Sequence, residues 1–218
     1  LNVCGGSGID VDNDGICDWN DGDSYATVQI GNQLWMAENL KVTHYNNGAD
    51  IPTGFGNDEW TELTTGAYTF YDNDSSNIAI YGNLYNWYAI DDYRGLCPES
   101  WHVPTDDEWT ELTTFVIASI KLKGYSDNNN SWNDNITDEY DFSVLPSGFR
   151  AGIMNDGIFK EKDIITLFYS STEIDSSIFI PNELVTDGHV YCRRMQHSGM
   201  DTVTRSKKLG LSIRCIKD

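Results

Sequence analysis

One stretch of the chain carries the apolar spacing of an amphipathic helix. Thr105 stands where a helix would begin, and Glu108 follows three residues later, which is the pattern of a capping box. Apolar residues then recur at i, i+3, i+7 and i+11: Trp109, Leu112, Val116 and Ile120. The spacing predicts a capped helix with one buried face.

A second segment nearly repeats the sequence at the start of this helix. Asp58–Gly66 reads DEWTELTTG, and Asp107–Phe115 reads DEWTELTTF. An internal repeat is one interpretation. The flanking sequences do not match, however, and we favour two similar helical turns, the first ended early by Gly66.

Elsewhere the pattern is that of short strands joined by loops. ATVQI and QLWM flank Gly31-Asn32, a two-residue hairpin signal. LPSGFRAG is followed by Asp156-Gly157 and IFKEK, which predicts a second hairpin, and ITLFYSSTE and LSIRCI read as strands. GYSDNNNSWNDNITDEYD predicts a polar surface loop. We therefore expect an α+β fold with short antiparallel strands, two helices and long loops.

The net charge and the apolar content of the chain limit the kinds of partner that we expect. The chain has 218 residues, a formal net charge of −20 and a pI near 4.3. Such an acidic chain repels phosphate backbones, so nucleic acid is not an expected partner. No apolar run approaches membrane-spanning length. No signal peptide is visible, which is consistent with a removed signal or lipoprotein anchor, or with a fragment of a longer protein.

The first 24 residues differ from the rest and contain a candidate calcium loop. Counted from Asp10, carboxylates stand at positions 1, 3, 5, 9 and 12, and Gly15 stands at position 6, where such a loop turns sharply. The expected ligands are Asp10, Asp12, Asp14, Asp18 and Asp21, with the backbone carbonyl of Ile16. Asp at position 12 resembles thrombospondin type 3 or dockerin loops more than an EF-hand. The alternative is a solvated acidic linker; we expect structural Ca²⁺.

The chain has five cysteines: Cys4, Cys17, Cys97, Cys192 and Cys215. None forms a CxxC pair, so a thiolate zinc site is not expected. Cys4 and Cys17 bracket the acidic loop and are placed to close it. The histidines are scattered without metal-binding spacing.

Several motifs together resemble a known family. They are YGNLYNWYAI and RGLCPESWHVPTDDEWTEL between Tyr81 and Leu112, LPSGFR at Leu145–Arg150, YSSTE at Tyr169–Glu173 and the terminal LGLSIRCIKD. The wording resembles the Fibrobacter succinogenes major paralogous domain over Tyr25–Asp218. The resemblance implies a C-type-lectin-like fold related to formylglycine-generating enzymes, in a secreted or cell-surface bacterial protein. It also implies a Cys97–Cys215 disulfide, which suits an oxidising compartment and leaves Cys192 over.

These observations divide the chain into an acidic calcium-binding loop or linker, residues 1–24, and a C-type-lectin-like domain, residues 25–218. In folds of this branch, the segment between YSSTE and the terminal strand forms the exposed binding face. Its aromatic and cationic residues are of the types that recognition surfaces use. The predicted ligand-binding residues are Phe179, Tyr191, Arg193, Arg194 and His197. The alternative is that such residues alternate between core and solvent along a strand, with arginines paired to nearby aspartates.

The function expected from the sequence is an exported bacterial surface module for binding or adhesion, with an extracellular glycan or protein as its target. A structural, self-assembling surface protein without a small ligand is the first alternative. The second is a formylglycine-generating-like oxidase, which needs a pair of reactive cysteines. Cys192 has no free neighbour if Cys215 is bridged, and no complete catalytic set is present, so we expect no enzymatic activity.

Overall fold

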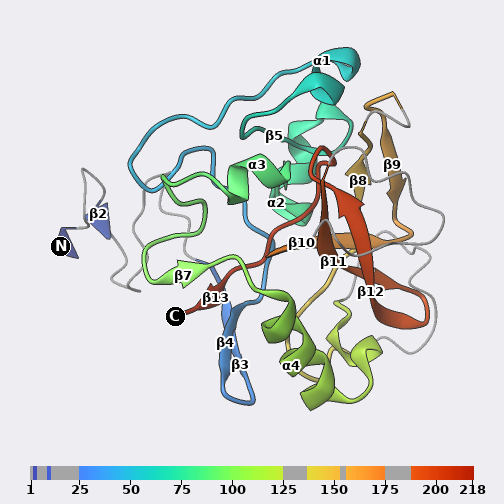
Figure 1. Cartoon of the computed structure of the whole chain (residues 1–218). Coiled ribbons are helices and arrows are strands. Elements are labelled where there is room, and N and C mark those ends of the chain that lie inside the picture. The colour runs from blue at the N-terminus through green and yellow to red at the C-terminus, as the bar shows by residue number, and fades with distance from the viewer. Residues whose placement is uncertain (1, 4–8, 11–24, 125–136, 153–155, 175–187) are drawn as a thin grey trace.

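The computed structural model describes residues 2–3, 9–10, 25–124, 137–152, 156–174 and 188–218. Their largest sheet has the strand order β12-β11-β10-β8-β9, in which β8 and β10 are parallel and the other neighbours antiparallel. A second sheet has the order β3-β4-β13-β7, and two-stranded pairs are formed by β5 with β6 and by β1 with β2. Figure 1 shows α1 and α4 at opposite ends of the molecule, with β10 and β11 between them and the β3–β4 hairpin beside α4. The fold is α+β with short, mostly antiparallel strands and long loops, as predicted, although the described residues form four α-helices where two were expected.

The elements have the following bounds. The strands are β1 (Asn2–Val3), β2 (Ile9–Asp10), β3 (Thr27–Ile30), β4 (Gln33–Met36), β5 (Tyr68–Thr69), β6 (Leu84–Tyr85), β7 (Trp101–His102), β8 (Ser147–Arg150), β9 (Phe159–Lys162), β10 (Thr166–Glu173), β11 (His189–Gln196), β12 (Gly199–Ser206) and β13 (Ile216–Lys217). The helices are α1 (Asn57–Glu62), α2 (Ile78–Tyr81), α3 (Trp87–Ile90) and α4 (Asp106–Val116), with 3-10 turns η1 (Tyr71–Asn73), η2 (Ser75–Asn77) and η3 (Ser119–Leu122).

The predicted turn signals are largely confirmed. β3 and β4 pair around Gly31-Asn32, and Gly31 takes a φ of 60°, a backbone conformation that glycine adopts readily. The predicted second hairpin is formed by β8 and β9. The closing strand is shorter than expected, because regular pairing is confined to β13. Leu211 and Ser212 form only isolated bridges before it.

The capping box of α4 is confirmed, whereas the helix ends earlier than predicted. The Thr105 hydroxyl accepts a hydrogen bond from the Glu108 N–H, and the Glu108 carboxylate accepts one from the Thr105 N–H at 2.8 Å. The helix stops at Val116, and Ile120 lies in η3 instead of on its last turn. The chain leaves through a γ-turn, since Ile117 has φ 58° and ψ −49° and the Ala118 N–H donates to the Val116 carbonyl.

Two apolar clusters make up the core of the described part of the chain. Successive residues of β10 point to opposite faces of the sheet, so Leu167 and Tyr169 join the first cluster while Phe168 joins the second. The second cluster contains Trp35 and Trp109, whose ring centroids lie 4.8 Å apart. Within the first cluster, Cys97 and Cys215 form the disulfide that the family resemblance implies. It joins positions 118 residues apart in the sequence.

Within the described ranges, four cations are buried: Lys123, Arg150, Arg193 and Arg214. Among the described residues no Asp or Glu is buried to the same degree. Burial lowers the pKa of Arg150 to about 10 and that of Arg214 to about 9, because desolvation disfavours the charged form. Since these four positive charges lie inside, the surface of the described residues is more acidic than their total charge alone suggests.

Candidate binding surface on the β11–β12 hairpin

The predicted binding segment contains the hairpin of β11 and β12. The two strands pair in continuous antiparallel register from His189↔Ser206 to Gln196↔Gly199, joined by a two-residue turn. β12 comes last in the strand order, and its residues after Gly199 are all half-buried or exposed. Most of those residues are polar or charged: Asp201, Thr202, Thr204, Arg205 and Ser206. The hairpin therefore presents hydrogen-bonding side chains on a regular support.

β11 is covered by an apolar cluster on each of its faces. The predicted site residues on this strand therefore have different surroundings. Cys192 points into the first apolar cluster and Met195 into the second. Arg193 lies on the same side of the strand as Met195 and is 1% exposed. Its guanidinium is thus part of the interior and not of the solvent-facing surface that the sequence predicted.

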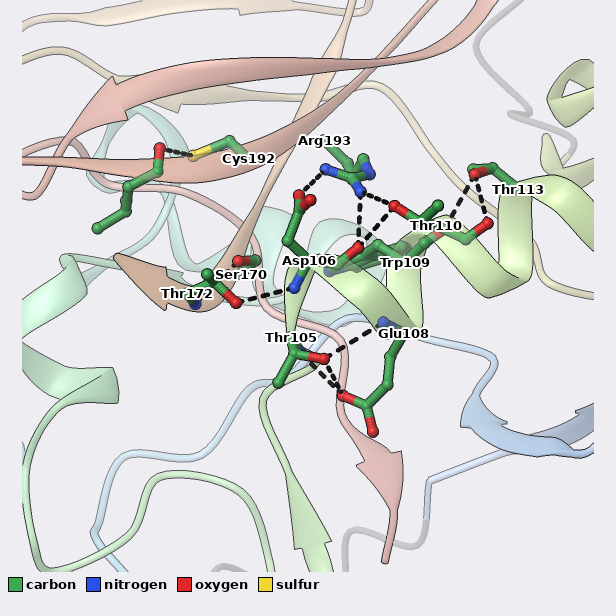
Figure 2. Close-up of polar contacts among 11 residues, drawn as sticks. Thr105, Asp106, Glu108, Trp109, Thr110, Thr113, Ser170, Thr172, Cys192 and Arg193 are labelled. Carbon is green, nitrogen blue, oxygen red and sulfur yellow. Dashed lines mark hydrogen bonds and ion pairs between the residues drawn. The ribbon is translucent and has the colours of Figure 1, made fainter. Parts of the chain in front are cut away.

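Arg193 ties the sheet to the start of α4, as Figure 2 shows. It forms an ion pair with the Asp106 carboxylate and donates at 2.8 Å both to the Asp106 carbonyl and to the Thr110 hydroxyl. The Asp106 N–H in turn donates to the Thr172 hydroxyl of β10 at 2.9 Å. These contacts hold the start of α4 against the neighbouring strands β10 and β11. Asp106 and Thr110 are separated from Arg193 by more than eighty residues, and no sequence signal linked them to it.

The other predicted residues do not share one face. Tyr191 is half-buried, and Arg194 lies on the opposite side of β11 because the two are three residues apart. The Arg194 side chain is 30% exposed and forms a bidentate pair with Asp201 across the hairpin, at 3.1 and 2.5 Å. His197 is exposed in the turn. Phe179 lies outside the described residues. The expected alternative of core–solvent alternation with paired arginines thus describes Arg193 and Arg194 well.

Cys192 is fully buried, and burial raises the pKa of its thiol. Its Sγ lies 3.7 Å from the Val190 carbonyl. The remaining described cysteines, Cys97 and Cys215, are bonded to each other. The described part of the chain therefore offers no exposed thiol pair of the kind that the oxidase alternative requires.

The predicted calcium loop lies almost entirely outside the described residues. Of its six ligands, only the backbone of Asp10 is described, and it pairs in β2 with Asn2 of β1. The Asp10 side chain and the ligands from Asp12 to Asp21 lie outside the described residues. The predicted Cys4–Cys17 bridge falls there as well. Within the described residues, no three His, Cys, Asp or Glu side chains are grouped so as to hold a metal ion. Calcium binding by this chain remains a prediction.

One polar cluster that the sequence only partly indicated lies beside the start of α4. His102 contacts the Asp218 carboxylate through Nδ1 at 2.7 Å and the Glu108 carboxylate through Nε2 at 2.9 Å. Burial alone would lower the pKa of His102, but the hydrogen bonds and charges of Asp218 and Glu108 raise it overall. Through these two partners His102 joins β7, α4 and the residue after β13.

Comparison with known proteins agrees with the family motifs. No curated protein and no solved structure matches this chain. Among the described residues, no helix is both long and apolar enough to cross a membrane. The family described as the Fibrobacter succinogenes major domain matches residues 28–217, which is most of the sequence. On that match, the chain belongs to the Fibrobacter succinogenes major domain family.

Proposed function

We propose that this protein is an exported bacterial surface module that binds an extracellular glycan or protein through the segment containing β11 and β12. The observation that carries the proposal is the position of β12 at the end of the strand order, with polar side chains only partly buried. β11 beside it is fixed by two apolar clusters and by the Arg193–Asp106 pair. A rigid strand that supports a polar outer strand suits recognition, because little conformational entropy is lost on binding.

One further observation supports export. The Cys97–Cys215 disulfide lies in the core, and disulfides persist mainly in oxidising compartments. The acidic surface adds solubility and disfavours contact with other polyanions. We propose a secreted or cell-surface location on these grounds, and structural Ca²⁺ in the loop from Asp10 to Asp21.

A binding role is proposed in preference to an enzymatic one. The oxidase alternative needs accessible, reactive thiols, and the burial of Cys192 gives it no support. Within the proposed surface, Tyr191, Arg194 and His197 remain candidates for ligand contact. Arg193 is assigned to the structural support of that surface.

The test is an array of glycans and bacterial surface polymers probed with the purified protein in calcium and then in EDTA. Alanine variants at Tyr191, Arg194 and His197 are compared with Glu62→Ala on α1, an exposed residue in a different element. We expect at least one hairpin variant to lose retention while its thermal unfolding stays unchanged, and Glu62→Ala to behave as the wild type.

The outcomes separate the roles of the hairpin and of calcium. Retention that survives EDTA and is lost in a hairpin variant supports recognition by the hairpin with calcium in a structural role. Retention lost in EDTA ties recognition to an ion. If no hairpin variant changes retention, the proposed surface is wrong. If nothing on the array is retained, the glycan target is wrong, and sedimentation against concentration then tests self-assembly.

A further inference from the structure

A second surface, apart from the hairpin, is built around Tyr93. This side chain is 95% exposed in the loop between α3 and β7. Figure 1 shows that loop on the side of the molecule away from β12. With so little of its ring in contact with the protein, Tyr93 contributes almost nothing to the core, and its aromatic surface is fully available to a ligand.

The turn that carries Tyr93 is held rigidly on both sides of it. Arg94 donates to the Asp92 carboxylate through Nε at 2.8 Å and through Nη2 at 2.7 Å, and its backbone N–H donates to the same carboxylate. The Gly95 N–H closes the turn on the Asp92 carbonyl at 3.0 Å. The bond to Arg94 lowers the pKa of Asp92, so the pair persists over the ordinary pH range.

The same turn is anchored to the protein beneath it. The Arg94 guanidinium lies over the buried Tyr45 ring, 3.9 Å from its centroid. The Asn46 N–H donates to the Gly95 carbonyl at 3.0 Å. Gly95 has a φ of 76°, and a Cβ there would lie 2.7 Å from the Asn46 amide nitrogen. Tyr93 is therefore presented by a preorganised loop, which removes much of the ordering cost of binding.

The groups next to Tyr93 are polar. The Asn46 side-chain amide lies against Gly95 of the turn, and Asp91 is exposed two residues before Tyr93. The Arg94 side chain donates to Asp92 through Nε and Nη2 and is 25% exposed. The other large exposed apolar side chains described lie in different elements: Ile80, Phe115, Ile117, Ile158 and Ile164. A protein interface centred on Tyr93 would need an apolar surround, since hot spots lie within well-packed, desolvated patches.

We propose that the Tyr93 turn is a saccharide-binding site, in which a neutral pyranose ring stacks on Tyr93 and its hydroxyl groups bond to Asn46, Asp91 and Arg94. The apolar C–H face of a sugar ring packs on an aromatic plate, and amide, carboxylate and guanidinium groups match its hydroxyls. Anionic polymers are disfavoured by the net charge of −20. This site does not depend on the hairpin surface proposed above.

The test is affinity electrophoresis of the full chain through native gels containing dextran, galactomannan or mixed-linkage β-glucan. We expect at least one of these neutral polysaccharides to retard the protein. Tyr93→Ala should weaken that retardation about tenfold in Kd because the aromatic contact is lost, while Tyr93→Phe keeps it. Asp92→Ala, which frees the turn but leaves Tyr93 in place, should weaken binding severalfold.

Controls distinguish this site from the hairpin. Because Tyr93 is exposed, thermal unfolding of Tyr93→Ala should match the wild type, and Glu62→Ala on α1 should be retarded as strongly as the wild type. The proposal is overturned if none of the three polymers retards the protein, or if Tyr93→Ala is retarded equally. It is also overturned if only hairpin variants lose retardation, or if Tyr93→Ala reduces capture of a protein partner and not of a polysaccharide.

Discussion

The two copies of DEWTELTT fold differently although eight consecutive residues are identical, Asp58–Thr65 and Asp107–Thr114. Both begin a helix, and both place a fully buried tryptophan near its start, Trp60 in α1 and Trp109 in α4. Yet α1 has six residues and α4 has eleven. The shared sequence determines where each helix starts and which ring is buried, whereas contacts with the surrounding structure determine the length of the helix.

Contacts outside the motif end α1. Its C-cap residue, Leu63, is already extended, and the next segment is bound by the Asn86 side chain, which pairs with the Thr65 carbonyl and the Ala67 N–H. Gly66 lies so close to Tyr45 that a Cβ would meet its hydroxyl at 2.0 Å. In α4 the corresponding turn buries Leu112 and Val116, so continuing the helix adds apolar contacts.

The largest expected difference between the copies is at the tryptophans. Trp109 stacks with Trp35 and Phe168, at centroid distances of 4.8 and 5.3 Å, so Trp109→Ala leaves a cavity in the second cluster. Trp60 instead lies under the Arg150 guanidinium and donates to the Lys208 carbonyl. We expect each change to lower the free energy of unfolding by about 3–5 kcal/mol, with Trp109→Ala at the upper end.

Urea unfolding of the disulfide-intact protein measures both effects. Trp60→Phe and Trp109→Phe are the matched controls, because each keeps an aromatic ring and should lower the free energy less than the alanine change. A larger loss for Trp60→Ala than for Trp109→Ala would mean that the ring over Arg150 matters more than the aromatic cluster.

Much of this comparison could be predicted from the sequence, because its signals are local. The Thr105–Glu108 cap and the Gly31-Asn32 hairpin both follow from residues within a few positions of one another. The Cys97–Cys215 disulfide required the family resemblance, because spacing alone does not pair cysteines.

The interior role of Arg193 could not be predicted in this way. An arginine in a polar stretch of an acidic chain suggests exposure, and its burial depends on Asp106, which lies 87 residues earlier. The exit of α4 through Ile117 was missed for a related reason. A β-branched residue at positive φ runs against local propensity and is tolerated only because the surrounding structure imposes it.

The capping glutamates give the next contrast. Glu108 accepts from the N–H and hydroxyl of Thr105 and contacts His102, while exposed Glu59 accepts from the Gly56 N–H. We expect Glu108→Ala to lower the free energy of unfolding by about 1–2 kcal/mol and Glu59→Ala to change it by less than about 0.5 kcal/mol.

Chemical denaturation measures this difference, and each copy supplies its own control. Glu111→Ala and Glu62→Ala remove the same charge from the equivalent exposed position further along each helix. Equal losses for Glu108→Ala and Glu59→Ala would show that capping does not distinguish the copies.

The backbone that follows each copy of the motif predicts a smaller change in the free energy of unfolding, and one of opposite sign. Ile117 is 91% exposed at a φ of 58°, so Ile117→Gly relieves backbone strain without losing buried surface. We expect it to raise the free energy of unfolding by about 1 kcal/mol. Thr114→Gly, inside α4, should lower it by about 0.5–1 kcal/mol, while the equivalent Thr65→Gly, outside α1, should have less effect. A destabilised Ile117→Gly variant would contradict strain at the γ-turn.

The smallest expected effect is a pH dependence of the free energy of unfolding. Only the second copy should show it, because Glu108 pairs with His102 whereas Glu59 makes no ion pair with a described residue. His102 has a raised pKa, so its stabilising contribution is complete below its unfolded value of 6.5 and is lost as the pH rises through the higher folded value. For Glu108, burial alone would raise the pKa, but bonds from Thr105 and His102 lower it. Its contribution is therefore present above 4.5 and is lost as the pH falls through the folded value.

The two contributions overlap between about pH 4.5 and 6.5, where charged His102 and charged Glu108 coexist. The decisive measurement is the difference in free energy of unfolding between the wild type and His102→Gln, taken at pH 5.5 and at pH 8.5. We expect this difference to be larger at pH 5.5, by less than about 1 kcal/mol because the groups are partly exposed. In a Glu108→Gln background the same difference should depend less on pH, since only Asp218 remains as a charged partner. An equal or larger difference at pH 8.5 would show that His102 contributes to the start of α4 through neutral hydrogen bonds and not through its charge.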